Sequence, residues 1–435
     1  MNFSSFFKTA HYLKKEAVVL RKSVSGRTPD HVLRWDNQDM PLGIYISVPF
    51  CRTKCSYCNF ASDVFSRVVF DRYVDRVCAD IANSSSMAAD MGGQIELQVD
   101  SVYLGGGTPT VLEPAQLKRI FDAVQKQFNV QSNAETTVEC APGTLTSGVI
   151  EGLLVCGVNR VSLGVQSFVD AEAAAVGRLH KRTTVLEEIA RLRAAGIANL
   201  NVDLIAGLPH QTEESWRESL TEMLATGTPH VSVYMLEVDD ESRLGREVMA
   251  GGTRYHAHFV PNEEATADFY LAACDRLEAA GIAQYEISNF ARAGSESRHN
   301  LKYWNRQPYL GFGVDAHSML PSATPDADAV RFSTANVLEK YIAGYAPQKT
   351  VVSRTNALEE SFFLGLRLNR GVDLRTVAAT FGKPALDNLH SAIAELIADG
   401  LMHRDGDRIY LSSRGRLLSN EVFQVFLASS GAPAL

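Results

Sequence analysis

The sequence lacks a long hydrophobic run, an excess of basic charge and the cysteine density of a disulfide-rich protein. No run of about 18 apolar residues is present, which argues against a membrane-spanning helix. The 42 Lys and Arg residues are outnumbered by 50 Asp and Glu residues, which argues against general nucleic-acid binding. Seven cysteines, an odd number, in 435 residues indicate a reducing compartment, and the cytoplasm fits best.

Acidic residues are nearly missing from the first 27 positions. Six Lys and Arg residues stand there against one acidic residue, Glu16, with aromatic and aliphatic residues between them. We interpret residues 1–40 as a basic extension. An organelle-targeting segment and a helix on a membrane surface remain open alternatives, because both are basic, amphipathic and poor in acids.

Three of the cysteines lie close together in the sequence, at Cys51, Cys55 and Cys58. They follow the apolar run 42–48, which is typical of a strand, so the cysteines are expected in the loop at its C-terminal end. Thiolates bind soft metals and iron–sulfur clusters. The spacing therefore predicts a metal or cluster site at this loop.

A fourth ligand for this site is missing nearby. The next cysteine, Cys78, comes twenty residues later, and no histidine lies between His31 and His180. A closed zinc site would need four ligands. Three thiolates instead suit a four-iron cluster with one open iron, where a small molecule carrying an amino and a carboxylate group could chelate.

Predicted strands alternate with predicted helices through the first half of the chain. We expect strands at 42–48, 101–104, 135–139, 160–165, 199–205 and 230–234. We expect helices at 70–82, 114–128, 146–155, 184–195 and 213–225. This alternation predicts parallel βα units in an α/β fold. Polar residues at the C-terminal ends of the strands favour a partial (β/α)6 barrel over a doubly wound sheet.

The second half is predicted to add a smaller domain. A connecting region, 236–350, should hold a helix at 263–280, an edge strand at 284–291 and a surface loop at 321–330. Helices at 357–366, 374–381 and 385–399, a hairpin at 401–411 and a last helix to about residue 427 predict a winged-helix-like α+β domain at 351–435. Residues 355–435 hold 8 basic and 9 acidic residues. We therefore expect no DNA-binding surface on this domain. We expect it to act as a packing module or lid over the predicted barrel, which spans residues 41–235.

The predicted strand 101–104 runs into three glycines, Gly105, Gly106 and Gly107, followed by Thr108. Consecutive glycines let the backbone approach a ligand closely. A dinucleotide-binding fingerprint does not fit, because its last glycine position is held by Thr110.

The cysteine spacing, with Tyr57 before the third cysteine, resembles the signature of the radical S-adenosylmethionine (SAM) family. The resemblance implies a 4Fe–4S cluster on the three cysteines, with the amino-acid end of SAM on the open iron. The triple-glycine segment is similar to the one that holds the SAM amino group in that family. Carried over to this sequence, the SAM contacts are Tyr45, Tyr57, Gly106, Gly107, Thr108, Glu139, Gln166, Arg178 and Asp203.

A second motif begins at His299 and continues to Tyr303 and Trp304. Imidazole is an axial ligand of heme iron, although a lone histidine is more often structural. With the segment 285–291, the motif resembles the HemW family of heme chaperones, relatives of the oxygen-independent coproporphyrinogen III oxidases. That resemblance implies that heme is a further cofactor, that His299 is its ligand and that the partners are heme-acceptor apoproteins. Whether the chain forms a homodimer is left open.

Two other functions remain as alternatives. The first is an enzyme that decarboxylates coproporphyrinogen III, but its family carries a further cysteine where this chain has Phe60. The second is a winged-helix regulator with an iron–sulfur sensor, which the charge balance of residues 355–435 disfavours.

Overall fold

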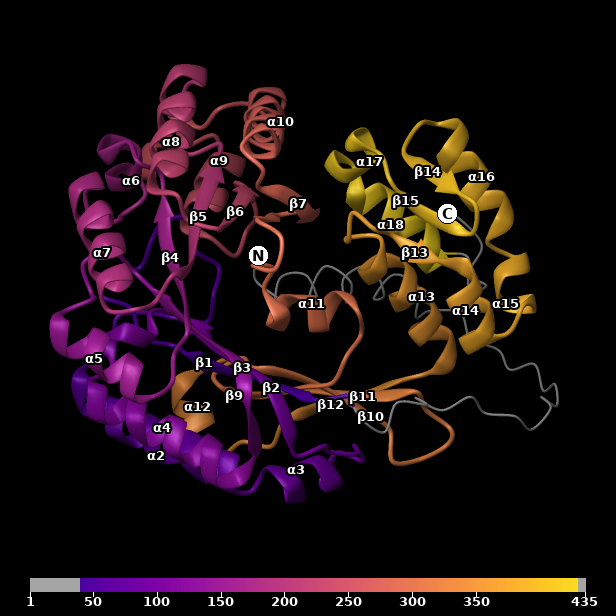
Figure 1. Ribbon diagram of the computed structural model, residues 1–435, viewed down its shortest axis with the longest axis horizontal. Helices are drawn as coiled ribbons and strands as arrows, with labels where there is room; N and C mark the ends of the chain where they lie inside the picture. The colour runs from indigo at the N-terminus through magenta and orange to yellow at the C-terminus, as the bar shows by residue number, and fades with distance from the viewer. Residues whose placement is uncertain (1–39, 429–435) are drawn as a thin grey trace.

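The computed structural model describes residues 40–428, so the expectations for the basic N-terminal extension lie outside the described residues (Figure 1). A 12-stranded sheet forms its centre. Six neighbouring parallel strands follow chain order: β1 (Leu42–Val48), β2 (Gln98–Gly106), β3 (Asn129–Cys140), β4 (Arg160–Gln166), β5 (Asn199–Ala206) and β6 (His230–Met235). Further strands extend the sheet beyond β1 and β6, so β1 and β6 do not pair and the barrel stays open. The predicted α/β partial barrel is confirmed.

Helices surround this curved sheet along the lower, left and upper sides of Figure 1. They are α2 (Phe70–Ala82), α3 (Ser84–Asp90), α4 (Pro114–Gln127), α5 (Ser147–Val155), α6 (Asp170–Ala175), α7 (Arg182–Ala194), α8 (Glu213–Thr226), α9 (Arg243–Met249) and α10 (Glu263–Ala279). Local sequence fixes their ends: α4 begins at Pro114 with a capping box, and Gly227 ends α8 in the left-handed conformation. None of the helices in residues 40–428 is long and apolar enough to cross a membrane.

The sheet continues past both edges of the barrel. Beyond β1 come β9 (Tyr309–Gly313), β10 (His317–Pro321), β11 (Ala329–Ser333) and β12 (Gln348–Val352); beyond β6 come β8 (Asn289–Ala291) and β7 (Ala283–Glu286). The sequence did not predict β9–β12, and the loop predicted at 321–330 is shorter because β11 begins at Ala329. Glycines in β9 lower its strand propensity, yet Gly311 is needed, since a side chain there would meet the backbone of His317.

The C-terminal region forms a separate small core. Its elements are α13 (Arg354–Gly365), β13 (Val372–Asp373), α14 (Leu374–Phe381), α15 (Pro384–Asp387), α16 (His390–Ala398), β14 (Met402–Asp405), β15 (Arg408–Leu411), α17 (Ser413–Leu417) and α18 (Ser419–Ala428). The helix predicted at 385–399 is wrong as one unit: it breaks after α15 and resumes at His390, and Leu386, Leu389 and Ile393 are all buried. The β14–β15 hairpin is confirmed.

This small domain faces the open side of the barrel, with α11 (Arg298–Trp304) lying between the two in Figure 1. The short helix α12 (Leu338–Ile342) packs near α2 on the barrel side. Backbone hydrogen bonds join the two parts, from Ile287 N to Arg367 O and from Asn369 N to Tyr285 O. The strand edge at β7 therefore holds the C-terminal domain beside the barrel opening.

Candidate functional site

The three motif cysteines lie in the loop after β1, and all seven cysteines of the chain are free. Within residues 40–428, no group of three or more His, Cys, Asp or Glu side chains is arranged to hold a metal ion. A cubane cluster binds each thiolate through a different iron, so its ligands need not converge on one point. The donor set at Cys51, Cys55 and Cys58 therefore fits a four-iron cluster by its chemistry.

Cationic side chains contact two of these sulfurs. Arg178 Nη1 donates to Cys55 Sγ at 3.6 Å, and Lys54 Nζ donates to Cys58 Sγ at 3.8 Å. Burial raises the pKa of the Cys51 and Cys58 thiols, while Lys54 acts to lower the pKa of Cys58. Lys54 thus opposes the effect of burial on Cys58 and favours its thiolate form, which is the form that binds iron.

The glycine-rich segment after β2 packs directly against the cysteine loop. Gly107 N donates to Val48 O at 2.7 Å, and Thr108 N donates to Phe50 O at 2.7 Å. A Cβ atom added to Gly107 would lie 2.7 Å from Phe50 O and 3.0 Å from Cys51 Sγ. Only glycine fits here, because any side chain would push the cysteine loop away.

A cavity of about 530 Å³ opens inside the barrel, towards the C-terminal ends of its strands. Every candidate site residue named from the sequence lines it. The thirteen residues are Tyr45, Cys51, Cys55, Tyr57, Cys58, Gly106, Gly107, Thr108, Glu139, Gln166, Arg178, Asp203 and His299. The fold therefore brings residues from 45 to 299 of the sequence to one space, which has the size of a small-molecule site.

Gln166, the last residue of β4, and Arg178, which follows α6, have unusual surroundings. Gln166 has a φ of 71°, a conformation that non-glycine residues adopt at a cost, and it follows an irregularity in the β4–β5 pairing. Arg178 donates to the carbonyl of Gly164, but its buried Nε finds no hydrogen-bond partner among the described residues. A buried, unused guanidinium donor beside a cavity is suited to an anionic ligand.

Two half-buried carboxylates face the same cavity. Glu139 accepts hydrogen bonds from Tyr103 Oη at 2.8 Å and from Gly106 N at 3.2 Å. Burial, together with the nearby Asp203, raises the pKa of Glu139 to about 7. Asp203 accepts from Asn201 Nδ2 at 2.7 Å and from Ser162 Oγ at 3.0 Å, and burial raises its pKa as well. These carboxylates can accept hydrogen bonds from a polar ligand.

Comparison with known proteins places this site in a family. The profile of the radical SAM superfamily matches residues 45–223, and that of the HemN C-terminal domain matches residues 352–418. The heme chaperone HemW of Bacillus subtilis is 36% identical over 387 residues, covering 88% of this chain and 98% of that protein. This chain belongs to the HemW family of radical SAM proteins. The HemW of Lactococcus lactis is 33% identical, covering 89% of this chain and 97% of that protein.

The fold of this HemW-family chain also resembles a solved enzyme structure. Coproporphyrinogen III oxidase (HemN) from Escherichia coli superposes with a TM-score of 0.75, covering 89% of this chain and 90% of that one. The two sequences are 24% identical, so the likeness concerns the fold alone.

The histidine of the second HemW-family motif is fully engaged within the protein. His299 is 1% exposed; Ser101 Oγ lies 3.0 Å from its Nδ1, and Tyr303 Oη lies 2.8 Å from its Nε2. Burial lowers its pKa to about 3, and the nearby Lys302 acts in the same direction. Iron could therefore reach Nε2 only if Tyr303 moved away.

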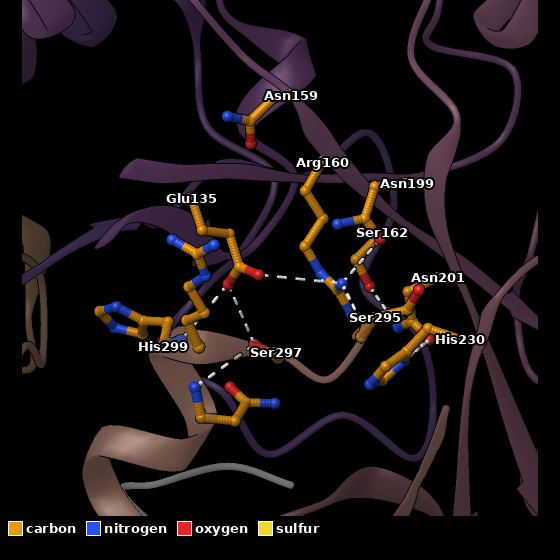
Figure 2. Close-up of polar contacts among 12 residues, drawn as sticks. Glu135, Asn159, Arg160, Ser162, Asn199, Asn201, His230, Ser295, Ser297 and His299 are labelled. Carbon is orange, nitrogen blue, oxygen red and sulfur yellow. Dashed lines mark hydrogen bonds and ion pairs between the residues drawn. The ribbon is translucent and has the colours of Figure 1, made fainter. Parts of the chain in front are cut away.

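The helix that carries His299 is anchored to the sheet through Glu135 (Figure 2). Glu135 Oε1 accepts from His299 N at 3.3 Å and lies 3.5 Å from Ser297 Oγ, while Glu135 Oε2 lies 3.9 Å from Arg160 Nη1. Arg160 begins β4, whereas the cysteine loop follows the end of β1. His299 thus belongs to a polar network towards the start of the strands, away from the cysteines.

This network is the part of the site that sequence reasoning missed. His230 joins it through Tyr285, whose hydroxyl lies 2.9 Å from His230 Nε2 and accepts from Ser297 N at 3.2 Å. Asn201 Oδ1 in turn lies 2.6 Å from His230 Nδ1. Lys54 was also missed, although it lies inside the cysteine motif and donates to Phe60 O at 2.8 Å and Ser62 O at 2.7 Å. The position of Lys54 between two motif cysteines is the one sequence feature that could have identified it as a site residue. No neighbouring motif identifies Arg160 or His230.

Acid should destabilise the protein through His299. Its imidazole is neutral when folded, with a pKa near 3, but takes up a proton near pH 6.5 when unfolded. The unfolded state therefore binds more protons between these values, so the free energy of unfolding falls as pH falls through this window, by up to about 1.4 kcal/mol per pH unit. Above pH 6.5 the effect is absent.

Urea unfolding at pH 7 and pH 5 measures this effect. The loss of stability between the two pH values should be smaller in His299→Gln than in the wild type. Replacing the exposed His403 by Gln is the matched control and should leave the loss unchanged. An equal loss in His299→Gln and wild type would show that His299 already titrates normally.

Proposed function

We propose that this chain is a heme chaperone that holds a 4Fe–4S cluster and SAM, binds heme and passes it to acceptor apoproteins in the cytoplasm. The observation that carries the proposal is the single cavity lined by three free cysteines and nine candidate SAM contacts. Membership of the HemW family, whose curated members are named heme chaperones, supports the heme part of the proposal.

Each side chain has a defined task in this proposal. Cys51, Cys55 and Cys58 hold the cluster, which when bound supplies the electron for cleavage of SAM. Arg178 uses its unpaired Nε to bind a carboxylate, since a guanidinium pairs well with that group. Gln166 and Asp203 offer acceptors to the hydroxyl and amino groups of the nucleoside.

The family motif suggests that His299 contacts heme, and this contact requires a local rearrangement. Its Nε2 bonds the Tyr303 hydroxyl at 2.8 Å, so ligation requires this hydrogen bond to be exchanged for iron. The neutral state of the buried imidazole is compatible with ligation, because only a neutral imidazole has a free lone pair.

A coproporphyrinogen III oxidase is the second candidate. It is favoured by the C-terminal domain beside the cavity, whose Arg416 lines the wall and would face acidic substituents of a substrate. Phe60, which also lines the cavity, stands where the resemblance to that enzyme family asks for a further cysteine. We therefore prefer the chaperone.

The deciding experiment uses the full chain, reconstituted with iron and sulfide without oxygen. Heme is titrated in while the Soret band is recorded, and a heme-free acceptor protein is then added. The same sample is assayed with coproporphyrinogen III, SAM and dithionite. Stoichiometric heme uptake and transfer without turnover supports the chaperone. Catalytic turnover without a heme spectrum would replace it by the oxidase.

A further inference from the structure

A cluster of exposed histidines and aromatic rings lies outside the site described above. It consists of His210, after β5, and Tyr255, His256, His258 and Phe259, in the segment after α9. His210 Nε2 lies 3.0 Å from His256 Nδ1, and the ring centroids of His210 and His258 each lie 4.0 Å from that of Phe259. We call these five residues the outer histidine cluster.

The backbone of the outer histidine cluster is held in a costly conformation. His210, Tyr255 and His256 have φ values of 69°, 54° and 61°, and they are half of the six non-glycine residues with positive φ in residues 40–428. A non-glycine residue adopts this conformation only at a cost in free energy, and such residues concentrate at functional sites. His210 N donates to Phe259 O at 3.0 Å, which ties the two segments together.

A cavity of about 640 Å³ opens beside the outer histidine cluster. The residues Ala174–Gly177, at the end of α6, give it an apolar wall, and Lys54 and Ser56 of the cysteine loop form another. Tyr255 and Phe259 are 41% and 47% exposed, which is high for such large rings. The space thus combines apolar surface, aromatic faces and imidazole, and it adjoins the outer side of the cysteine loop.

Resting on the proposed function, we infer that the outer histidine cluster is an iron-porphyrin site, with His256 as the iron ligand and His210 as its positioning residue. When His256 Nδ1–H donates to His210 Nε2, the lone pair of His256 Nε2 is left for iron. Such an acceptor behind a ligating histidine fixes its tautomer and orientation. Phe259 and Tyr255 supply faces for the porphyrin ring.

This site differs from His299 in being accessible without rearrangement. Apart from His210, no side chain within residues 40–428 makes a hydrogen bond to His256, and the His256 side chain is exposed.

Titration of the full, cluster-reconstituted chain with ferric heme tests the site. We expect His256→Ala to lose the ligated Soret position, and added free imidazole to restore it. Without its hydrogen-bond acceptor, His210→Ala should bind heme about 10- to 100-fold more weakly. His403→Ala, an exposed control in the hairpin of the C-terminal domain, should retain the wild-type spectrum.

The outcomes separate this site from the proposed function. If the wild type shows no heme spectrum, the chaperone proposal fails and the site fails with it. If the wild type binds heme but His256→Ala and His210→Ala bind it equally well, only the outer site is overturned. Loss of binding in His299→Ala alone would place the ligand inside the barrel and overturn the outer site too.

Discussion

Cys55→Ala is expected to abolish cluster assembly. The wild type should take up about four irons per chain with matching sulfide on anaerobic reconstitution, and the variant should keep almost none. The reason is that the described loop offers three thiolates and no fourth protein ligand, so losing one leaves the cluster with two. Cys55 is also the sulfur that Arg178 contacts at 3.6 Å, at the centre of the loop.

Cys156→Ala is the matched control for this prediction. Cys156 is buried to a similar degree, at 5% exposed against 7% for Cys55, but it follows α5 and does not line the cavity. It should keep the wild-type iron and sulfide content and the cluster's visible absorption. Equal iron loss in both variants would mean that burial of a thiol, and not ligation, sets the iron content.

The barrel could be predicted from sequence because its signals are local. The run 42–48 and the helix 70–82 were placed at the bounds that the structure has, since a continuous apolar run marks the first and amphipathic spacing marks the second. Strands β9–β12 could not be predicted, because each has only five residues; β9 also contains two glycines and is stabilised by pairing with β1 from far along the chain. The break after α15 depends on core packing, which local sequence does not encode.

The candidate site likewise combines residues that local motifs predict with contacts that depend on distant parts of the chain. The cysteine loop and glycine segment are contiguous motifs, and the strand ends supply Glu139, Gln166 and Asp203 through the barrel topology alone. The hydrogen bonds of His299 could not be foreseen, because Ser101 lies almost 200 residues earlier in the chain. A motif identifies which residues matter, while the packing around them determines which atoms remain available for a ligand.

Arg367→Ala should be among the most destabilising single substitutions at the domain junction. Arg367 and Glu286 are 2% and 0% exposed; Arg367 Nη2 lies 3.6 Å from Glu286 Oε2, and its guanidinium lies 4.3 Å from the ring of Trp304. Removing the arginine leaves a buried carboxylate without its cation, which costs about 3–5 kcal/mol. The cost falls on the contact that holds the C-terminal domain beside the cavity.

Urea unfolding followed by tryptophan fluorescence measures this loss, because Trp304 reports on the junction. Arg217→Ala removes the exposed ion pair with Glu213 and should cost under about 0.5 kcal/mol, which makes it the matched control. The double variant Glu286→Gln, Arg367→Met should recover much of the stability, since no charge is then left buried alone. If Arg367→Ala unfolds at the same urea concentration as Arg217→Ala, the junction does not depend on this pair, and the C-terminal domain is held by its apolar contacts and backbone hydrogen bonds.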